Sequence, residues 1–321
     1  MRPGRLSGRD SLLRMVEAEP FANLPELTTV LLRFRAEVEQ RLPPLPTTAF
    51  HGTLGHALRE LACLAPERKD CPDCPHLPLC PYAVLFEPRP VQDAGNGVTN
   101  RAPPPIVIAP EEPIAGRDPV VLRSGDVLTV RLSLVGSLVR QHLALIVAAM
   151  KKAGARGIGL PLEERVRSMR KRPPLRLDEV QPLDLDAAPL ANRVQLRFTT
   201  PVRIKHDGKI LGRLEAIPLY AAMTRRADLL SRLYGTGPVA LAAAPPFAIA
   251  ASEMRMLGVR RYSTRQRQRI DMPGQIGWVE LEGDLPSITP LLRFLERVQM
   301  GKATTFGLGR FIIEDAARGA E

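Results

Sequence analysis

Four cysteines, the only ones in the chain, lie in one short segment at Cys63, Cys71, Cys74 and Cys80. Their spacing, C-x7-C-x2-C-x5-C, contains a C-x2-C pair, which is able to turn two thiolates toward one ion. Cys63 and Cys80 would complete a tetrahedral set, with His76 as a substitute ligand. The pattern predicts a structural zinc ion or an iron–sulfur cluster. Reduced thiols that hold no metal are the alternative.

Five histidines are available for proton transfer, because imidazole titrates near neutral pH. His51 and His56 are five positions apart on a predicted helix, about 140° around its axis, so they do not share a face. His56 is expected to pair locally with Glu60. His142 is expected among apolar residues of a second helix, and His206 lies in a turn sequence, KHDG. These three are therefore weaker candidates for catalysis than His51.

A loop near the C-terminus combines glycines with cations. Its members are Gly301, Gly307, Gly309, Lys302 and Arg310. Glycine lets the backbone approach a phosphate closely, and the two cations would neutralise it. The loop is no Walker A motif, because Ala303 stands where that motif needs Ser or Thr. The pattern favours RNA contacts by Gly307, Gly309 and Arg310, and a simple turn before an edge strand is the alternative.

An arginine run precedes this loop. It contains Arg255, Arg260, Arg261, Arg265, Arg267 and Arg269. The last three alternate along an extended segment, so they would project from one face and form a track for phosphates. A solvated, positively charged sheet edge is the alternative. A second basic segment, residues 165–176, is expected to be solvated surface.

The overall charge also indicates a polyanionic partner. The 321 residues carry a net charge of +11, with 38 Arg against 7 Lys, and phosphate contacts made by cations release counterions. An Arg-rich composition typical of GC-rich genomes is the alternative. Aromatic residues make up only 4%, which argues against extensive base stacking. We expect a cytoplasmic protein with no membrane association, because residues 1–19 lack a signal peptide and prolines interrupt the uncharged stretch 233–252.

Hydrophobic periodicity predicts the elements that must position these residues. In the first half the predicted order is strand, helix, strand, strand, helix, strand, at residues 28–39, 50–63, 105–110, 126–135, 137–153 and within 155–182. In the second half the same order recurs at residues 193–204, 213–234, 254–270, 275–284, 287–299 and 304–314. A hairpin turn is expected at Pro273 and Gly274. We therefore predict an α+β protein of two tandem ferredoxin-like (RRM-like) domains, residues 1–187 and 188–321, with a cysteine-bearing insertion at 64–86.

Four motifs together resemble a known family. They are FHGTLGHALRELAC at 50–63, CPDCPHLPLCPYAVLFEP at 71–88, RRYSTRQ at 260–266 and GKATTFGLGRF at 301–311. In order and spacing the chain resembles the CRISPR-associated endoribonucleases of the RAMP superfamily that process precursor CRISPR RNA, in particular a branch with a cysteine cluster after its first helix. The resemblance covers most of the chain, from about residue 28 to residue 311.

The resemblance implies cleavage of repeat RNA without a catalytic metal or other cofactor. In that reaction the 2′-hydroxyl of one nucleotide attacks the adjacent phosphate, which leaves a 2′,3′-cyclic phosphate and a 5′-hydroxyl. The family places a catalytic histidine near the first helix, so His51 is expected to act as base or acid. Lys302 or a nearby Arg would stabilise charge, and Tyr262 is a weak candidate for the second catalytic group.

Two other functions stay open at this point. One is a RAMP subunit that binds CRISPR RNA without cutting it, within an effector complex with other CRISPR subunits. The other is a zinc-dependent DNA-binding protein or nuclease with its cysteines near the chemistry.

Overall fold

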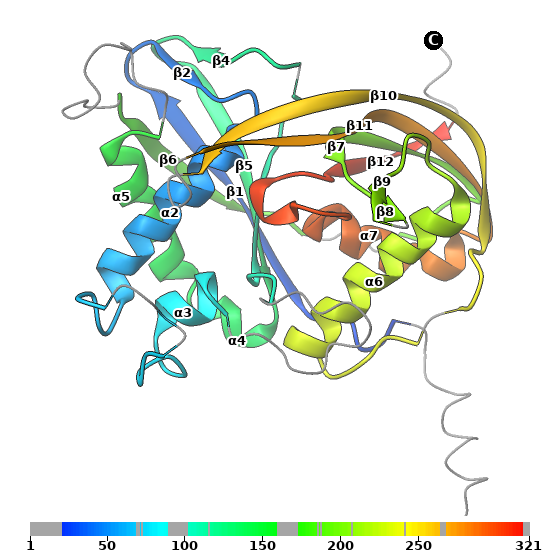
Figure 1. Cartoon of the computed structure of the whole chain (residues 1–321), viewed down its shortest axis with the longest axis horizontal. Helices are drawn as coiled ribbons and strands as arrows, with labels where there is room; N and C mark the ends of the chain where they lie inside the picture. The colour runs from blue at the N-terminus through cyan, green and yellow to red at the C-terminus, as the bar shows by residue number, and fades with distance from the viewer. Residues whose placement is uncertain are drawn as a thin grey trace, which may run out of the picture.

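The computed structural model describes residues 21–68, 71, 73–88, 102–114, 116–158, 173–184, 186, 188–206, 208–240, 242–263 and 268–316. Within these residues the chain forms two four-stranded antiparallel sheets, one in each half, with helices packed against them (Figure 1). The predicted α+β class with tandem ferredoxin-like folds is confirmed by their topology.

The first sheet has the strand order β3-β5-β1-β6. Its elements follow the chain as β1 (Leu27–Ala36), α2 (Thr47–Ala62), β3 (Ile106–Pro110), β5 (Val127–Val135), α5 (Leu143–Arg156) and β6 (Leu175–Pro182). In β1 the alternating residues Val30, Leu32, Phe34 and Ala36 are buried, as expected for a strand with one face on a core. The first and third strands are central, which is the ferredoxin-like order.

The second sheet repeats this topology with the order β10-β11-β7-β12. Its elements are β7 (Arg193–Val202), α6 (Ala216–Tyr234), β10 (Phe247–Ser263), β11 (Gln268–Gly283), α7 (Thr289–Val298) and β12 (Phe311–Asp315). The expected domain boundary near residue 187 falls between the last strand of the first sheet and the first strand of the second.

The β10–β11 hairpin differs from the prediction. Pro273 and Gly274 form no turn; they lie inside β11, opposite Gly258 and Leu257 of β10. The strands instead pair out to Ser263 and Gln268; β10 begins earlier than expected, at Phe247, and β11 is longer than expected, with 16 residues. A Cβ at Gly274 would lie 2.8 Å from the carbonyl oxygen of Val202, so this glycine allows close packing between strands rather than a turn.

The expected helix at 137–153 is divided. A short α4 (Ser137–Arg140) ends before Gln141, and α5 begins after His142, which caps it. Several small elements were not predicted from the sequence. They are β2 (Gln40–Leu42), α3 (Pro81–Phe86), β4 (Val120–Leu122), β8 (Lys205–His206), β9 (Lys209–Ile210), and the 3-10 turns η1 (Pro286–Ile288) and η2 (Thr304–Phe306).

The long hairpin joins the two halves of the chain. Figure 1 shows β10 and β11 running from the second sheet across to α2 and the first sheet. Their outer ends bury an apolar cluster that draws on both halves; its members are Leu45, Ile114, Leu257, Val259, Met272, Ile276 and Leu308. The hairpin thereby brings its arginines close to the start of α2.

No helix among the described residues is both long enough and apolar enough to cross a bilayer. The uncharged stretch 233–252 is divided between the end of α6, a loop and the start of β10.

Candidate active site

His51 lies in the first turns of α2, between two aromatic rings. Its ring centroid is 4.6 Å from that of Phe86, at the end of α3, and 5.1 Å from that of Phe306, in η2. Part of the residue remains exposed, but its Nε2 atom is buried and has no hydrogen-bond partner. The site therefore holds an imidazole nitrogen without a partner, at a junction of both halves of the chain.

The loop that carries Phe306 is fastened directly to the start of α2. Thr47 donates a hydrogen bond from Oγ1 to the carbonyl oxygen of Phe306, at 2.9 Å. Gly307 follows with φ of 93°, and a Cβ there would lie 2.1 Å from Thr47 Oγ1. Only glycine combines this left-handed backbone with so close an approach. The contact fixes Phe306 against His51.

A third residue, Arg261 of β10, completes this group. Its guanidinium carbon lies 3.9 Å from the centroid of the Phe306 ring, a cation–π contact. Burial and the positive charge of Arg261 lower the pKa of His51 from 6.5 to about 4. The start of a helix also opposes an added proton. His51 is consequently neutral at physiological pH and is able to accept a proton.

The glycines of the C-terminal loop have a different role from the one predicted. Gly307 and Gly309 are buried, and a Cβ at Gly309 would lie 1.9 Å from the carbonyl oxygen of Met300. The loop closes on itself and on β7, because Met300 N donates to Gly309 O at 3.2 Å and Gly309 N donates to Pro201 O at 2.9 Å. These glycines pack against protein backbone, so the expectation that they approach an RNA phosphate is corrected.

Arg310 also departs from its predicted role. Its side chain is 2% exposed, its Nη1 donates to Thr199 Oγ1 at 2.7 Å, and its Nη2 pairs with Glu111 at 3.1 Å. Glu111, from the first half of the chain, also pairs with the buried Arg131. Arg310 is thus a structural residue at the junction of the two halves, and its guanidinium is not free to bind RNA.

Lys302 lies on the same loop as Phe306, and its side chain is exposed. The backbone holds its position, since Lys302 N donates to Arg203 O at 2.9 Å. The structure therefore brings the loop of Lys302 to His51, with the aromatic ring of Phe306 as the contact.

The hairpin arginines separate into two groups. Arg255, Arg260 and Arg269 are exposed, and Arg260 pairs across the strands with Asp271 at 2.8 Å. Arg261 is half-buried over Phe306. Arg265 and Arg267, the side chain of Tyr262 and most of the basic segment at 165–176 lie outside the described residues. The phosphate track predicted for Arg265, Arg267 and Arg269 remains a prediction.

The other histidines are away from this group. His56 is exposed on α2, and its expected partner Glu60 binds Lys152 and Arg156 of α5 instead. His142 is partly exposed at the start of α5, not in a core, and His206 is exposed in β8. None of the three has a ring contact with His51 among the described residues.

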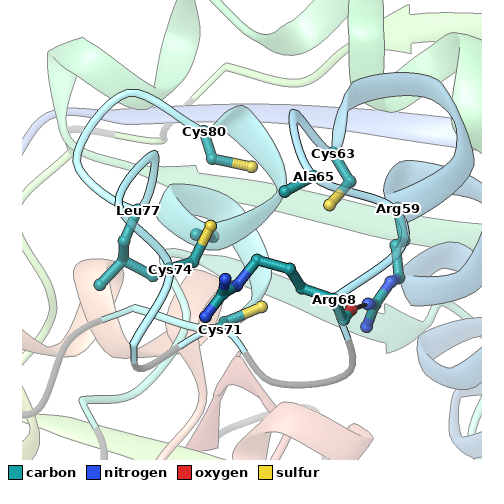
Figure 2. Close-up of a pocket in the computed structure, with 9 residues that line it drawn as sticks. Arg59, Cys63, Ala65, Arg68, Cys71, Cys74, Leu77 and Cys80 are labelled. Atoms are coloured by element: carbon teal, nitrogen blue, oxygen red, sulfur yellow. Dashed lines mark hydrogen bonds between the residues drawn. The ribbon is translucent and has the colours of Figure 1, made fainter.

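The four cysteines line one small pocket beyond the far end of α2 (Figure 2). Cys63 caps α2, Cys80 precedes α3, and Cys71 and Cys74 lie on the loop between the two helices. All four are free thiols. Within the described residues no three His, Cys, Asp or Glu side chains form a ready-made metal site.

Two residues of the His51 group were missed in the sequence. Phe86 and Phe306 both fall within the motifs quoted above, but hydrophobic periodicity treats an isolated phenylalanine as core. The only available indication was that each stands beside a structure-breaking residue: Phe86 two positions before Pro88, and Phe306 next to Gly307.

Comparison with known proteins places these features in a family context. A family model of an N-terminal domain matches residues 24–197, and the model of the CRISPR-associated endoribonuclease Cas6 matches residues 196–311. No curated protein sequence matches the chain significantly.

Three solved structures share the fold over 90% or more of this chain. A Cas6 product complex from Thermus thermophilus is 14% identical with a TM-score of 0.53, over 90% of this chain and 100% of that one. A second Cas6 product complex is 18% identical with a TM-score of 0.51, over 90% and 99%. A partial Cas6-RT-Cas1–Cas2 complex is 14% identical with a TM-score of 0.52, over 93% of this chain and 47% of that chain.

Proposed function

The chain belongs to the CRISPR-associated Cas6 family, and on this premise we propose that it is the endoribonuclease that cuts precursor CRISPR RNA within its repeats. The observation that carries the proposal is the group formed by His51, Phe306 and Arg261. It joins an unpartnered imidazole nitrogen to a fixed cation at the junction of two ferredoxin-like folds.

The proposed reaction is a transesterification within the RNA. The 2′-oxygen of one nucleotide forms a bond to the adjacent phosphorus, and the bond from phosphorus to the 5′-oxygen of the next nucleotide breaks. The 2′-hydroxyl gives its proton to a base, and the leaving 5′-oxygen receives one from an acid. The nucleophile is already held on the substrate, so the reaction does not depend on a metal to generate it.

We assign the base to His51. Its pKa of about 4 keeps the imidazole neutral over the whole physiological range, and its buried Nε2 has no competing hydrogen-bond partner. Substrate entry must open the contact between His51 and Phe306 for a 2′-hydroxyl to reach Nε2. A neutral imidazole is better suited to accept the proton of the nucleophile than to protonate the leaving group.

We assign the stabilisation of developing negative charge to Arg261 and Lys302. Arg261 is held over Phe306, and its Nε is buried without a partner. A cation fixed before the reaction stabilises a charged transition state without reorganisation. Lys302, exposed on the same loop as Phe306, supplies a second positive charge. The exposed Arg255, Arg260 and Arg269 would bind the RNA backbone on either side.

One observation favours a second function, binding of CRISPR RNA without cleavage. A buried Nε2 between two aromatic rings is also what a structural histidine in a packed junction would show. In that case the chain would serve as an RNA-holding subunit beside other CRISPR proteins.

Incubation of the purified protein with repeat RNA in excess EDTA separates the two functions. The proposal expects a single cut that ends in a 2′,3′-cyclic phosphate, and no cut in RNA with a 2′-deoxy group at the scissile nucleotide. Tight binding of intact RNA without any cut would favour the second function. Cleavage of the deoxy substrate would exclude the proposed nucleophile.

A further inference from the structure

We propose that Cys63, Cys71, Cys74 and Cys80 bind one zinc ion as thiolates, and that this zinc site holds Phe86 against His51. The zinc site is independent of the reaction. The positioning of His51 rests on the proposed function.

The first evidence is that three separate pieces of chain bring all four thiols to one pocket. Figure 2 shows the four sulfur atoms turned toward a common space. Tight turns shape the segment, because Cys74 N donates to Cys71 O at 3.0 Å and Cys80 N donates to His76 O at 2.9 Å. The Cys80 thiol lies 3.7 Å from the carbonyl oxygen of Ala62, the residue before Cys63.

The second evidence is that two of the three leucines between Cys63 and Cys80 are exposed. Leu64 and Leu79 are 53% and 81% exposed, whereas Leu77 is buried and packs into the core of the first half. Segments too small to form a core are commonly held by a metal or by disulfides. All four cysteines are free, so their thiols are available to a metal.

The charges around the pocket fit a zinc–thiolate centre. Four thiolates around one Zn²⁺ carry a net charge of −2, and the pocket is also lined by Arg59 and Arg68. Both are fixed by hydrogen bonds to backbone: Arg59 donates to the carbonyl oxygen of Arg68, and Arg68 donates to that of Asp73 at 3.2 Å. Two guanidinium groups offset the charge of the site.

The composition of the site favours one ion over a cluster. A single zinc ion needs only the four thiolates that the segment supplies, whereas an iron–sulfur cluster also needs several iron ions and inorganic sulfide. The described thiols are neighbours and do not yet form a closed coordination shell. Binding of zinc would draw the sulfur atoms in to about 2.3 Å from the ion.

The site is connected to His51 through α3. Cys80 caps this helix, and Phe86 is its last residue, with its ring 4.6 Å from that of His51. The same ring fills the space beside Gly55, where a Cβ would lie 2.5 Å from it. A metal that fixes the start of α3 therefore also fixes the aromatic wall of the catalytic histidine.

Cobalt(II) titration of the full-length apo protein tests the metal site, because Co²⁺ in a tetrahedral thiolate site gives intense visible and thiolate charge-transfer bands. We expect saturation at about one equivalent, displacement of the bands by Zn²⁺, and zinc at about one equivalent in protein purified without added metal. Cys71→Ser and Cys74→Ser should each weaken and shift the bands, whereas the matched control His76→Ala should leave them unchanged. Octahedral cobalt spectra, or loss of the bands in His76→Ala, would overturn the four-thiolate site.

Titration of ¹³C-labelled His51 by NMR tests the positioning of Phe86. With zinc bound, the pKa of His51 should stay well below 6.5; after chelation, or in Cys74→Ser, it should rise toward 6.5. A His51 pKa that is the same with and without metal would overturn the positioning. A zinc site in a protein that cuts no RNA would refute only the proposed function, and RNA cleavage by a protein without a thiolate site would refute only the metal.

Discussion

The guanidinium of Arg261 lies 3.9 Å from the centre of the Phe306 ring, and the same ring forms an edge-on contact with His51. A cation, an aromatic ring and an imidazole from three distant parts of the sequence thus lie in series. The positive charge of Arg261 lowers the pKa of His51 and so helps to keep the histidine unprotonated. This relationship allows the role of each residue to be separated by mutation.

His51→Ala is expected to slow single-turnover cleavage by about 10²–10⁴-fold, the usual contribution of one positioned acid–base group. RNA affinity should change little, because many phosphate contacts remain. The matched control is His56→Ala, on the exposed face of the same helix. A wild-type rate in His51→Ala would move the active site elsewhere.

The pH dependence of cleavage reports the pKa of His51. The neutral imidazole is the active base, and its pKa is lowered to about 4, so kcat/KM should be flat from pH 8 down to about pH 5 and fall as the pH passes through about 4. Arg261→Gln removes the positive neighbour and should move this fall to higher pH. If kcat/KM falls at the same low pH in both proteins, the group whose protonation causes the fall is not His51.

Arg261→Ala and Arg260→Ala compare two adjacent arginines of one strand. Arg261→Ala should lower the single-turnover rate by more than tenfold, because it removes a fixed cation. Arg260 is exposed and pairs with Asp271, so Arg260→Ala should act mainly on RNA affinity. If the two variants lose rate and affinity equally, Arg261 does not stabilise the transition state more than its exposed neighbour Arg260 does.

The exposed arginines of the hairpin are tested by salt. Arg255→Ala combined with Arg269→Ala should weaken RNA binding and reduce the slope of log affinity against log salt concentration by about one or less for each lost contact. Arg225→Ala, on the exposed part of α6, is the control. An unchanged slope in the double variant would place the RNA path off this hairpin.

The ion pairs around Glu111 are expected to act on stability. Burial opposes ionisation of Glu111, but the hydrogen bonds and charges of Arg131 and Arg310 hold the pKa of its carboxyl below the usual 4.5. Glu111→Gln leaves two buried guanidinium groups without their counter-charge, so it should lower the free energy of unfolding by roughly 3–5 kcal/mol. Because the folded pKa is lowered, this stabilisation is present above pH 4.5 and is lost as the pH falls through that lowered pKa. Urea unfolding at pH 7 and pH 4 measures both effects; equal losses at the two pH values would contradict the assignment.

The sequence was informative about elements and less informative about contacts between them. Strand and helix periods predicted both ferredoxin-like units, because each element has one buried face, as Val30, Leu32 and Phe34 show. The prediction of a hairpin turn at Pro273 and Gly274 was wrong. A glycine that allows a neighbouring strand to pack closely cannot be distinguished, in sequence, from a glycine that forms a turn. Pro273 is tolerated since β7 pairs with β11 only from Gln275 onward.

The candidate site was predicted in part. His51 lies against the C-terminal loop through Phe306, a residue that was not predicted, and the loop glycines and Arg310 are buried. A glycine-rich, cationic loop has the same sequence pattern whether it binds a phosphate or packs against the rest of the protein. Which of the two occurs depends on Thr47, Glu111 and Thr199, partners that lie far away in the sequence.

The hydrogen bond from Thr47 to Phe306 has a consequence for synthesis of the protein. During translation, α2 leaves the ribosome early, with its histidine exposed and without its aromatic cover. The cover arrives only when η2 has been made, close to the end of the described chain. A nascent or truncated chain would therefore hold His51 without the loop that places Phe306 against it.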